Sequence, residues 1–154
     1  MNSIQNREEL EQKPPRLRKN QMANRPKDAR FLATHEWGRP EKDGTVTVGI
    51  TDFAVDQLND LTFIDFRKEK GDKIDKGESF GEIESVKAVS DMYCPISGEV
   101  VAVNSDVSAN DFEALKKDAF GKGWLLKIKP KNIKELDAAK SLADYEKQLA
   151  SEAH

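Results

Sequence analysis

The sequence contains a single cysteine, Cys94, and only two histidines, one of which is the C-terminal residue His154. One cysteine cannot form an internal disulfide, so the fold does not require an oxidising compartment. Two histidines and one cysteine provide no spacing typical of a zinc site. No apolar run approaches the roughly 20 residues that a membrane-spanning helix needs. A disulfide scaffold, a zinc centre and a membrane-spanning protein are therefore excluded.

Several motifs that mark common enzyme classes are also missing. The chain has no GxGxxG, GxxxxGK[ST], GxSxG or HExxH sequence, so the dinucleotide, P-loop, hydrolase and metalloprotease patterns do not apply. The first residues lack the apolar stretch of a secretory signal. Acidic residues among the N-terminal arginines, at Glu8, Glu9 and Glu11, argue against a transit peptide.

Apolar residues and charge divide the chain near residue 30. Residues 1–30 contain only 3 of the 35 Leu, Ile, Val and Phe residues and have a net charge of +4, whereas residues 31–154 have a net charge of −7. Residues 1–29 are therefore predicted to be a flexible, basic N-terminal extension, and residues 30–154 the folded domain. Met22 is an alternative start. Because the folded part is acidic, we expect no nucleic-acid partner.

Short β-prone runs separated by turn residues dominate the folded part. They predict strands over 31–37, 45–50, 61–66, 80–86, 88–93, 99–103 and 124–128, and short helices over 53–58 and 110–118. Apolar residues at helical spacing predict one C-terminal helix over 133–150. This succession indicates a mainly β domain, a compact sandwich or barrel with appended helices.

The most informative segment is 81–95, a candidate hairpin in which two short apolar runs meet at Lys87. Glu84 lies three residues before this lysine and Asp91 four residues after it. A lysine at a turn is usually a solvated charge that keeps a sheet edge soluble. The same position would present the side chain to a modifying enzyme, and its long stem could carry a tethered group between distant sites.

This segment resembles the lipoate attachment site of the glycine cleavage system H-protein family. The match runs through residues 84–88 (ESVKA), 90–91 and 95–100 (PISGEV), and other matching blocks are 35–37 (HEW), 48–51 (VGIT) and 121–124 (GKGW). The blocks span roughly residues 30–150. The resemblance implies a barrel-sandwich hybrid of the lipoyl- and biotinyl-carrier type, with short appended helices that include a C-terminal helical segment. Biotin carriers and 2-oxoacid dehydrogenase lipoyl domains fit less well, because Val86 and Ala88 flank the lysine.

The resemblance implies that Lys87 bears (R)-lipoate through an amide, which removes the charge of the lysine. The enzyme that attaches it would be a lipoate ligase or an octanoyltransferase. Residues implied to be recognised by that enzyme are Glu84, Asp91, Gly71 and Gly98.

The resemblance also implies a cleft that holds the loaded arm, with contributions from Thr34, Glu36 and Asp91. Carboxylate and hydroxyl groups suit an amine cation, and exclusion of water would slow loss of the carried group. His35 could be a catalytic base, but a carrier needs none, and a structural hydrogen bond is the favoured interpretation. Cys94 could exchange with a lipoyl disulfide, although a buried structural position is favoured.

The implied function is a carrier without catalytic activity of its own. It would move the aminomethyl group of glycine from a pyridoxal-phosphate glycine decarboxylase to a tetrahydrofolate-dependent aminomethyltransferase, and a flavin (FAD) dihydrolipoyl dehydrogenase would reoxidise it. No catalytic residue, metal or membrane partner is expected, and we expect a monomer. The expected compartment is the bacterial cytoplasm, or the mitochondrial matrix in a eukaryote.

Two departures and two alternatives accompany this resemblance. Residues 66–70 read FRKEK where many relatives have Leu-Pro-Glu, and Ala119 stands where a proline is common; both lie in expected loops and could alter docking to the decarboxylase or transferase. One alternative is a lipoyl carrier of another pathway, such as relay to 2-oxoacid dehydrogenases or sulfur oxidation. The other is an unmodified adaptor whose hairpin only docks partners.

Overall fold

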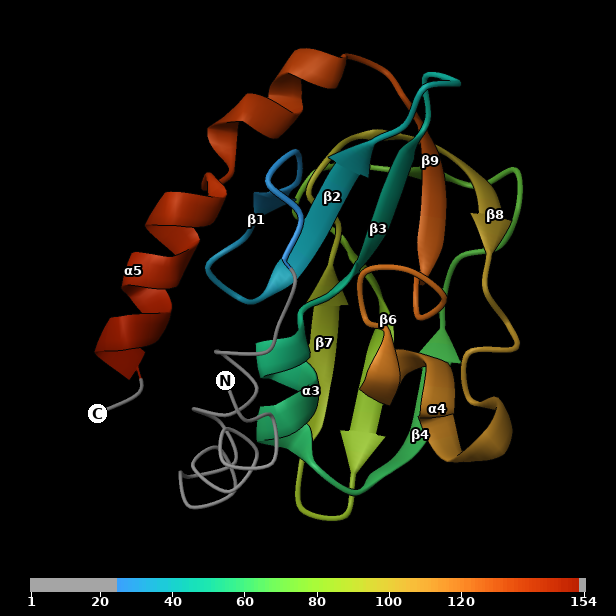
Figure 1. Ribbon diagram of the computed structural model, residues 1–154. Helices are drawn as coiled ribbons and strands as arrows, with labels where there is room; N and C mark the ends of the chain where they lie inside the picture. The colour runs from blue at the N-terminus through green and yellow to red at the C-terminus, as the bar shows by residue number, and fades with distance from the viewer. Residues whose placement is uncertain (1–24, 153–154) are drawn as a thin grey trace, which may run out of the picture.

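Two antiparallel sheets form the body of the protein (Figure 1), in a computed structural model that describes residues 25–152. The larger sheet has the order β1-β2-β3-β9-β8-β5, and the smaller has the order β4-β6-β7. The strands of the larger sheet are β1 (Arg30–Phe31), β2 (Glu36–Pro40), β3 (Val46–Ile50), β9 (Leu126–Pro130), β8 (Gly98–Val103) and β5 (Lys73–Ile74). Those of the smaller are β4 (Leu61–Phe66), β6 (Ser79–Ser85) and β7 (Val89–Tyr93).

Short helices lie at the margins of the sheets. They are α3 (Asp52–Leu58), α4 (Ala109–Lys117), the 3-10 helix η1 (Ile133–Ala138) and α5 (Leu142–Glu152). The predicted mainly β architecture with appended helices is therefore confirmed. No helix between residues 25 and 152 is long and apolar enough to span a bilayer.

The main core lies between the two sheets, and strand β3 is buried along its whole length. Val46, Val48 and Ile50 alternate into this core, as their spacing predicts. The opposite side of β3 is covered because the Trp37 ring lies over Gly49, where an added Cβ would be 2.7 Å from the ring. Only a glycine fits beneath this indole.

A second cluster attaches helix α5 to the larger sheet. The Phe31 and Tyr145 rings stack with centroids 4.7 Å apart and planes within 9°, and Leu149 packs in the same cluster. Burial of two aromatic rings and a leucine stabilises this attachment, at about 25 cal/mol for each Å² of apolar surface removed from water. The C-terminal helix is therefore an integral part of the domain.

Two predicted elements are wrong in the same region. The strand predicted over 31–37 is two strands, β1 and β2, because the chain turns at His35, where φ is 84°, and Phe31 pairs with Trp37. The single helix predicted over 133–150 is η1 followed by α5. The break occurs where Lys140 forms a β-bridge with Phe31, so its backbone groups are no longer available to a continuous helix.

The helix predicted over 110–118 is present, shifted to Ala109–Lys117, but its first turn is irregular. Asn110, Asp111 and Phe112 have positive φ, and Ser108 makes no side-chain cap. By contrast, Thr51 caps α3, since its hydroxyl accepts a hydrogen bond from the Ala54 amide at 3.2 Å.

Most of the predicted N-terminal extension, residues 1–24, lies outside the described residues. Within the described part, Arg25 is only 8% exposed, and its guanidinium donates to both carboxylate oxygens of Asp52 at 2.9 Å. It also pairs with Glu146 at 3.2 Å, and Ala29 is buried in the cluster beneath α5. Packing in the described chain thus begins before Arg30.

Candidate functional site

Lys87 lies in the turn that joins β6 to β7. The turn is closed by a hydrogen bond from the Ser85 amide to the Ala88 carbonyl at 2.8 Å, and the Val86 amide donates to the Asp60 carbonyl at 3.1 Å. Residues 86–89 are all exposed, and Val86 is 76% exposed. Lys87 makes no ion pair with any residue between 25 and 152. The side chain is therefore free to enter another protein.

Glu84 and Asp91 lie on the same small sheet as Lys87. Glu84 pairs with Val89 across β6 and β7, next to the turn, and Asp91 pairs with Glu82 farther along. The Asp91 carboxylate accepts a hydrogen bond from the Ser79 hydroxyl at 3.2 Å. The structure thus places both acids on the hairpin that presents the lysine.

Gly71 and Gly98 lie away from Lys87, toward the other end of the molecule. The β6–β7 turn adjoins the start of β4, because Ser85 pairs with Leu61, whereas Gly71 follows the far end of β4 (Figure 1). Gly71 has φ of 98°, which favours glycine. Gly98 opens β8, where an added Cβ would be 2.1 Å from the Lys129 carbonyl oxygen. Their geometry supports roles in shaping the loop and the strand pair.

A cavity of about 150 Å³ lies between the start of β2, helix α3 and strand β7. We call it the β2–β7 cleft. It contains all three residues predicted for an arm cleft, Thr34, Glu36 and Asp91. Its other lining residues are His35, Ile50, Ala54, Gln57, Leu58, Ile83, Ser90 and Met92.

Glu36 is the buried carboxyl group of this cleft and is only 1% exposed. One carboxylate oxygen accepts a hydrogen bond from the Thr34 hydroxyl, and the other accepts one from the Tyr93 amide at 2.7 Å. Burial raises the pKa of Glu36 above its usual value, and these two hydrogen bonds oppose the rise. A buried carboxylate that keeps unused lone pairs beside a cavity is suited to a cationic guest.

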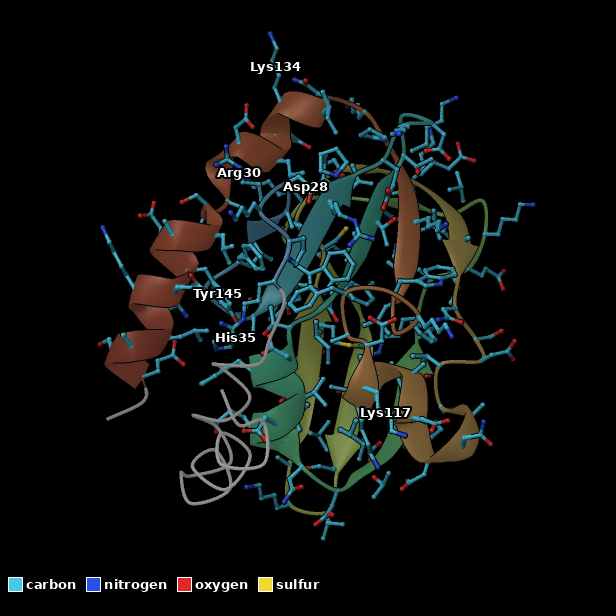
Figure 2. The ribbon with its side chains drawn as sticks, in the orientation of Figure 1. Asp28, Arg30, His35, Lys117, Lys134 and Tyr145 are labelled. Carbon is cyan, nitrogen blue, oxygen red and sulfur yellow. The ribbon has the colours of Figure 1, made fainter. Side chains whose placement is uncertain are left out.

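A hydrogen-bonded chain supports the turn that carries Glu36 (Figure 2). The Tyr145 hydroxyl lies 2.8 Å from His35 Nδ1 and 2.7 Å from Thr51 Oγ1, and His35 Nε2 lies 3.3 Å from a Glu152 oxygen. A neutral imidazole that donates from Nε2 to Glu152 accepts a hydrogen bond from the Tyr145 hydroxyl at Nδ1. Burial lowers the pKa of His35, and Glu152 opposes this. The predicted structural hydrogen bond of His35 is confirmed. No pattern in the sequence indicated that Tyr145 would be its partner.

Cys94 is fully buried, as predicted. Its thiol donates to the Ile96 carbonyl at 3.1 Å, and burial raises the pKa of the thiol to about 12. Since the thiolate is the nucleophile in disulfide exchange, this environment disfavours the redox alternative.

Arg67 is a residue that the sequence singled out only as a departure from the family pattern. Its guanidinium lies 2.9 Å from Glu82, 3.5 Å from Asp91 and 3.8 Å from Asp65. These three carboxylates occupy one row across β4, β6 and β7. Arg67 therefore offsets part of the negative charge of this row, of which Asp91 lines the β2–β7 cleft.

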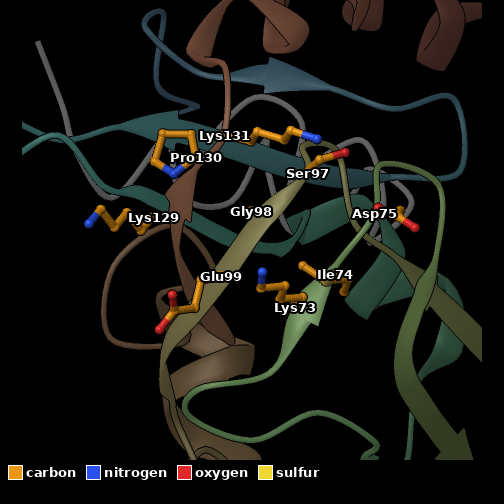
Figure 3. A pocket seen from close by; sticks show the side chains of 9 residues that line it. All are labelled: Lys73, Ile74, Asp75, Ser97, Gly98, Glu99, Lys129, Pro130 and Lys131. Carbon is orange, nitrogen blue, oxygen red and sulfur yellow. The ribbon is translucent and has the colours of Figure 1, made fainter.

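A second hollow, of about 360 Å³, lies between β5, β8 and β9 (Figure 3). Lys73, Lys129 and Lys131 line it together with Asp75 and Glu99. All three lysines lie on the side of the fold away from the β6–β7 turn, and the hollow has no buried charged group. It offers no arrangement comparable with Glu36 in the β2–β7 cleft.

Comparisons with known proteins agree with this geometry. The family model described as "Glycine cleavage H-protein" matches residues 29–152. The chain belongs to this family. It is 44% identical to the glycine cleavage system H protein of Psychrobacter cryohalolentis over 128 residues, which cover 83% of this chain and 100% of the relative. It is 46% identical to that of Thiobacillus denitrificans over 129 residues, which cover 84% and 98%.

A solved structure of the same family has a similar fold. The crystal structure of a glycine cleavage system H protein from Mycobacterium marinum superposes with a TM-score of 0.70 at 37% sequence identity. The superposition covers 82% of this chain and 99% of the other. The predicted lipoyl-carrier type of fold is therefore confirmed for this family member.

Proposed function

We propose that this H-protein family member carries lipoate on Lys87 and moves the aminomethyl group of glycine between the enzymes of the glycine cleavage system. The donor would be the pyridoxal-phosphate glycine decarboxylase, and the acceptor enzyme the tetrahydrofolate-dependent aminomethyltransferase. The observation that carries the proposal is an exposed lysine at the turn of a hairpin whose second strand lines a cleft with a buried carboxylate.

The position of Lys87 fits the attachment of a long acyl group. The residue is exposed in the β6–β7 turn and has no carboxylate partner among the described residues, so forming an amide at Nζ breaks no ion pair. When bound, lipoate supplies a disulfide that is reduced on accepting the aminomethyl group and must be reoxidised afterwards, by dihydrolipoyl dehydrogenase. Lys87 itself contributes the tether and its reach.

The β2–β7 cleft fits the storage of a cationic group. At about 3.3 Å per residue of strand, Asp91 lies roughly 10–13 Å from Lys87, a span that a lysine extended by an acyl chain can cover. Glu36 would pair with the amine cation, the Thr34 hydroxyl would orient Glu36, and Asp91 would supply a second negative charge at the rim. The apolar side chains of Ile83 and Met92 would limit access of water.

Recognition by the lipoate ligase or octanoyltransferase would divide between two kinds of residue. Glu84 and Asp91 are on the hairpin and available for contact. Gly71 and Gly98 would act through the fold, since one permits a left-handed backbone and the other a close strand approach.

In this role the protein has no catalytic residue. Its described residues bind, orient and shield a group, while the partner enzymes and the cofactor hold the chemistry. The bacterial source of the similar curated proteins leads us to propose the cytoplasm as the compartment.

Exchange of glycine carboxyl carbon with labelled bicarbonate tests this function. The assay combines glycine decarboxylase with the chain after treatment with lipoate ligase, lipoate and ATP. We expect exchange with the treated wild type and background exchange with treated Lys87→Arg, which keeps the positive charge but cannot be acylated. Exchange by Lys87→Arg equal to the wild type would contradict a carrier mechanism. A wild type that is lipoylated yet inactive would contradict the assignment to glycine cleavage.

A further inference from the structure

Three large apolar side chains are exposed at or beside Lys87: Val86, in the turn itself, is 76% exposed, and the other two lie on strands of the small sheet. Phe63 on β4 is 53% exposed, and Val89 on β7 is 58% exposed. Both pair with Glu84 on the central strand β6, so the three residues form one row across the small sheet. Residues directly opposite one another on neighbouring strands project to the same face. We call Phe63, Glu84 and Val89 the tip row.

The next row on this face differs in charge balance. Asp65, Glu82 and Asp91 are all within 4.0 Å of the Arg67 guanidinium. Glu84 makes no ion pair with any residue that the structure describes. The face therefore has, away from Lys87, a row of three carboxylates that share one guanidinium and, next to Lys87, a carboxylate with no ion pair between two exposed apolar groups.

We propose that the tip row is the docking surface for the enzyme that acylates Lys87, and that Phe63 and Val89 are its apolar anchors. This inference rests on the proposed function. The enzyme would present an apolar surface to the two side chains and a basic group to Glu84. An apolar pair with a central unpaired carboxylate is complementary to such a surface.

The reach of the lysine identifies the occupant. An unmodified lysine has only a four-carbon stem, so the acylating enzyme must bring its active site up to the β6–β7 turn, beside which the tip row lies. Once the acyl chain is attached, a partner can receive the end of the arm from a greater distance. The tip row therefore lies nearer to the enzyme that acylates Lys87 than to a later partner that receives the end of the extended arm.

Steady-state acylation of the full chain tests the proposal. The variants are Phe63→Thr and Val89→Thr, which place a β-branched, strand-compatible side chain at each position while removing the apolar anchor. The matched control is Ile133→Thr, because Ile133 is also exposed, at 43%, and lies in η1 at the opposite end of the molecule, beside the labelled Lys134 (Figure 2). Lipoate ligase, lipoate and ATP are supplied, and intact mass measures the rate.

We expect Phe63→Thr to lower kcat/KM for acylation about tenfold, Val89→Thr to lower it several-fold, and Ile133→Thr to change it less than twofold. Thermal unfolding of each variant shows whether the fold is kept. Acylation of folded Phe63→Thr at the wild-type rate would overturn the inference and leave the proposed function intact. Absence of acylation of the wild type would instead overturn the proposed function.

A second readout separates the acylating enzyme from other partners. Phe63→Thr is lipoylated to completion by long incubation and then assayed for glycine–bicarbonate exchange. We expect exchange to fall by less than the acylation rate does. An equal or larger fall in exchange would assign the tip row to the decarboxylase and contradict the choice of occupant.

Discussion

The β6–β7 turn and the turn over residues 32–36, which borders the β2–β7 cleft, are held in different ways. The β6–β7 turn with Lys87 is exposed, and two backbone hydrogen bonds, to Ala88 and Asp60, fix it. The turn over residues 32–36 has local backbone hydrogen bonds, from the Leu32 amide to the Glu36 carbonyl at 2.8 Å and from the His35 amide to the Leu32 carbonyl at 2.9 Å, and it is also fixed by bonds to distant parts of the chain. Tyr145 bonds His35, and the Tyr93 amide bonds Glu36.

This difference matches two tasks of the proposed function: the β6–β7 turn presents Lys87 to other proteins, and the turn over residues 32–36 receives the loaded arm. We call them the presenting turn and the receiving turn. A carrier needs one part that another protein can reach and modify, and a second part that holds its geometry when the arm returns. Exposure with few tertiary contacts suits the first task, whereas burial and converging hydrogen bonds preorganise the second. Substitutions in the receiving turn should therefore affect stability, and those in the presenting turn should not.

The largest effect is expected for Tyr145. Tyr145→Ala removes a fully buried ring that stacks on Phe31 and should lower the free energy of unfolding by about 3–5 kcal/mol. Tyr145→Phe leaves His35 and Thr51 without their shared partner and should cost about 1–3 kcal/mol. Urea unfolding followed by fluorescence measures both. Val86→Ala is the comparison in the presenting turn. A decrease of more than about 0.5 kcal/mol in its free energy of unfolding would contradict the proposed difference between the two turns.

Glu36→Gln should separate charge from shape in the cleft. The amide retains the size of the side chain but removes the negative charge that would pair with the amine cation. Loss of a charge-assisted hydrogen bond worth about 1.5–3 kcal/mol corresponds to roughly 10–100-fold faster release of the aminomethyl group to water. Formaldehyde release from loaded protein provides the measurement. Glu99→Gln, exposed on β8 and outside the cleft, is the control, and equal release rates for wild type and Glu36→Gln would count against the cleft.

His35 should make the receiving turn sensitive to pH. Because burial lowers its pKa in the folded state, the unfolded chain binds the proton more readily, and stability falls as pH drops below about 6.5. His35→Asn, which tolerates the positive φ at this position, removes this contribution. We therefore expect the stability difference between wild type and variant to shrink as pH falls from 8 to 5.5.

Urea unfolding of both proteins across this pH range tests the expectation. Glu36, whose raised pKa acts in the opposite direction, and His154 are present in both proteins, so the difference isolates His35. A constant stability difference across the range would show that His35 does not titrate differently on unfolding.

The smallest effect is expected for Glu152→Gln. Glu152 lies 3.3 Å from His35 Nε2 but is substantially exposed, so its removal should cost less than about 0.5 kcal/mol near pH 8. It should also lower the pKa of His35 further, since Glu152 raises it in the wild type. NMR titration of the His35 ring protons checks this direction. An unchanged or higher pKa would mean that the ion pair is not formed.

The presenting turn was predictable from local sequence, and the receiving turn only in part. Two apolar runs that meet at Lys87 predict a hairpin because strand patterning and turns depend on near neighbours. The bond between Glu36 and the Tyr93 amide joins residues 57 positions apart, and that between His35 and Tyr145 joins residues 110 apart. No local pattern encodes such pairs, although family motifs pointed to Thr34 and Glu36.

The wrong elements have the same origin. Residues 31–37 have the composition of a strand, but the left-handed backbone at His35 folds them into two. Residues 133–150 have helical spacing, but the bridge between Lys140 and Phe31 interrupts the helix. In both places long-range pairing overrides local preference. The role of Arg67 was also hidden, because its three carboxylate partners come from three strands.

The most direct test of the account is the mass of the chain after treatment with lipoate ligase, lipoate and ATP, with peptide mapping. The account predicts one lipoyl increment, confined to the peptide that contains Lys87 and absent from Lys87→Arg. No increment, while the same ligase modifies a control carrier, would contradict the central claim that the β6–β7 turn presents a lysine for acylation. An increment on any other lysine would contradict it equally.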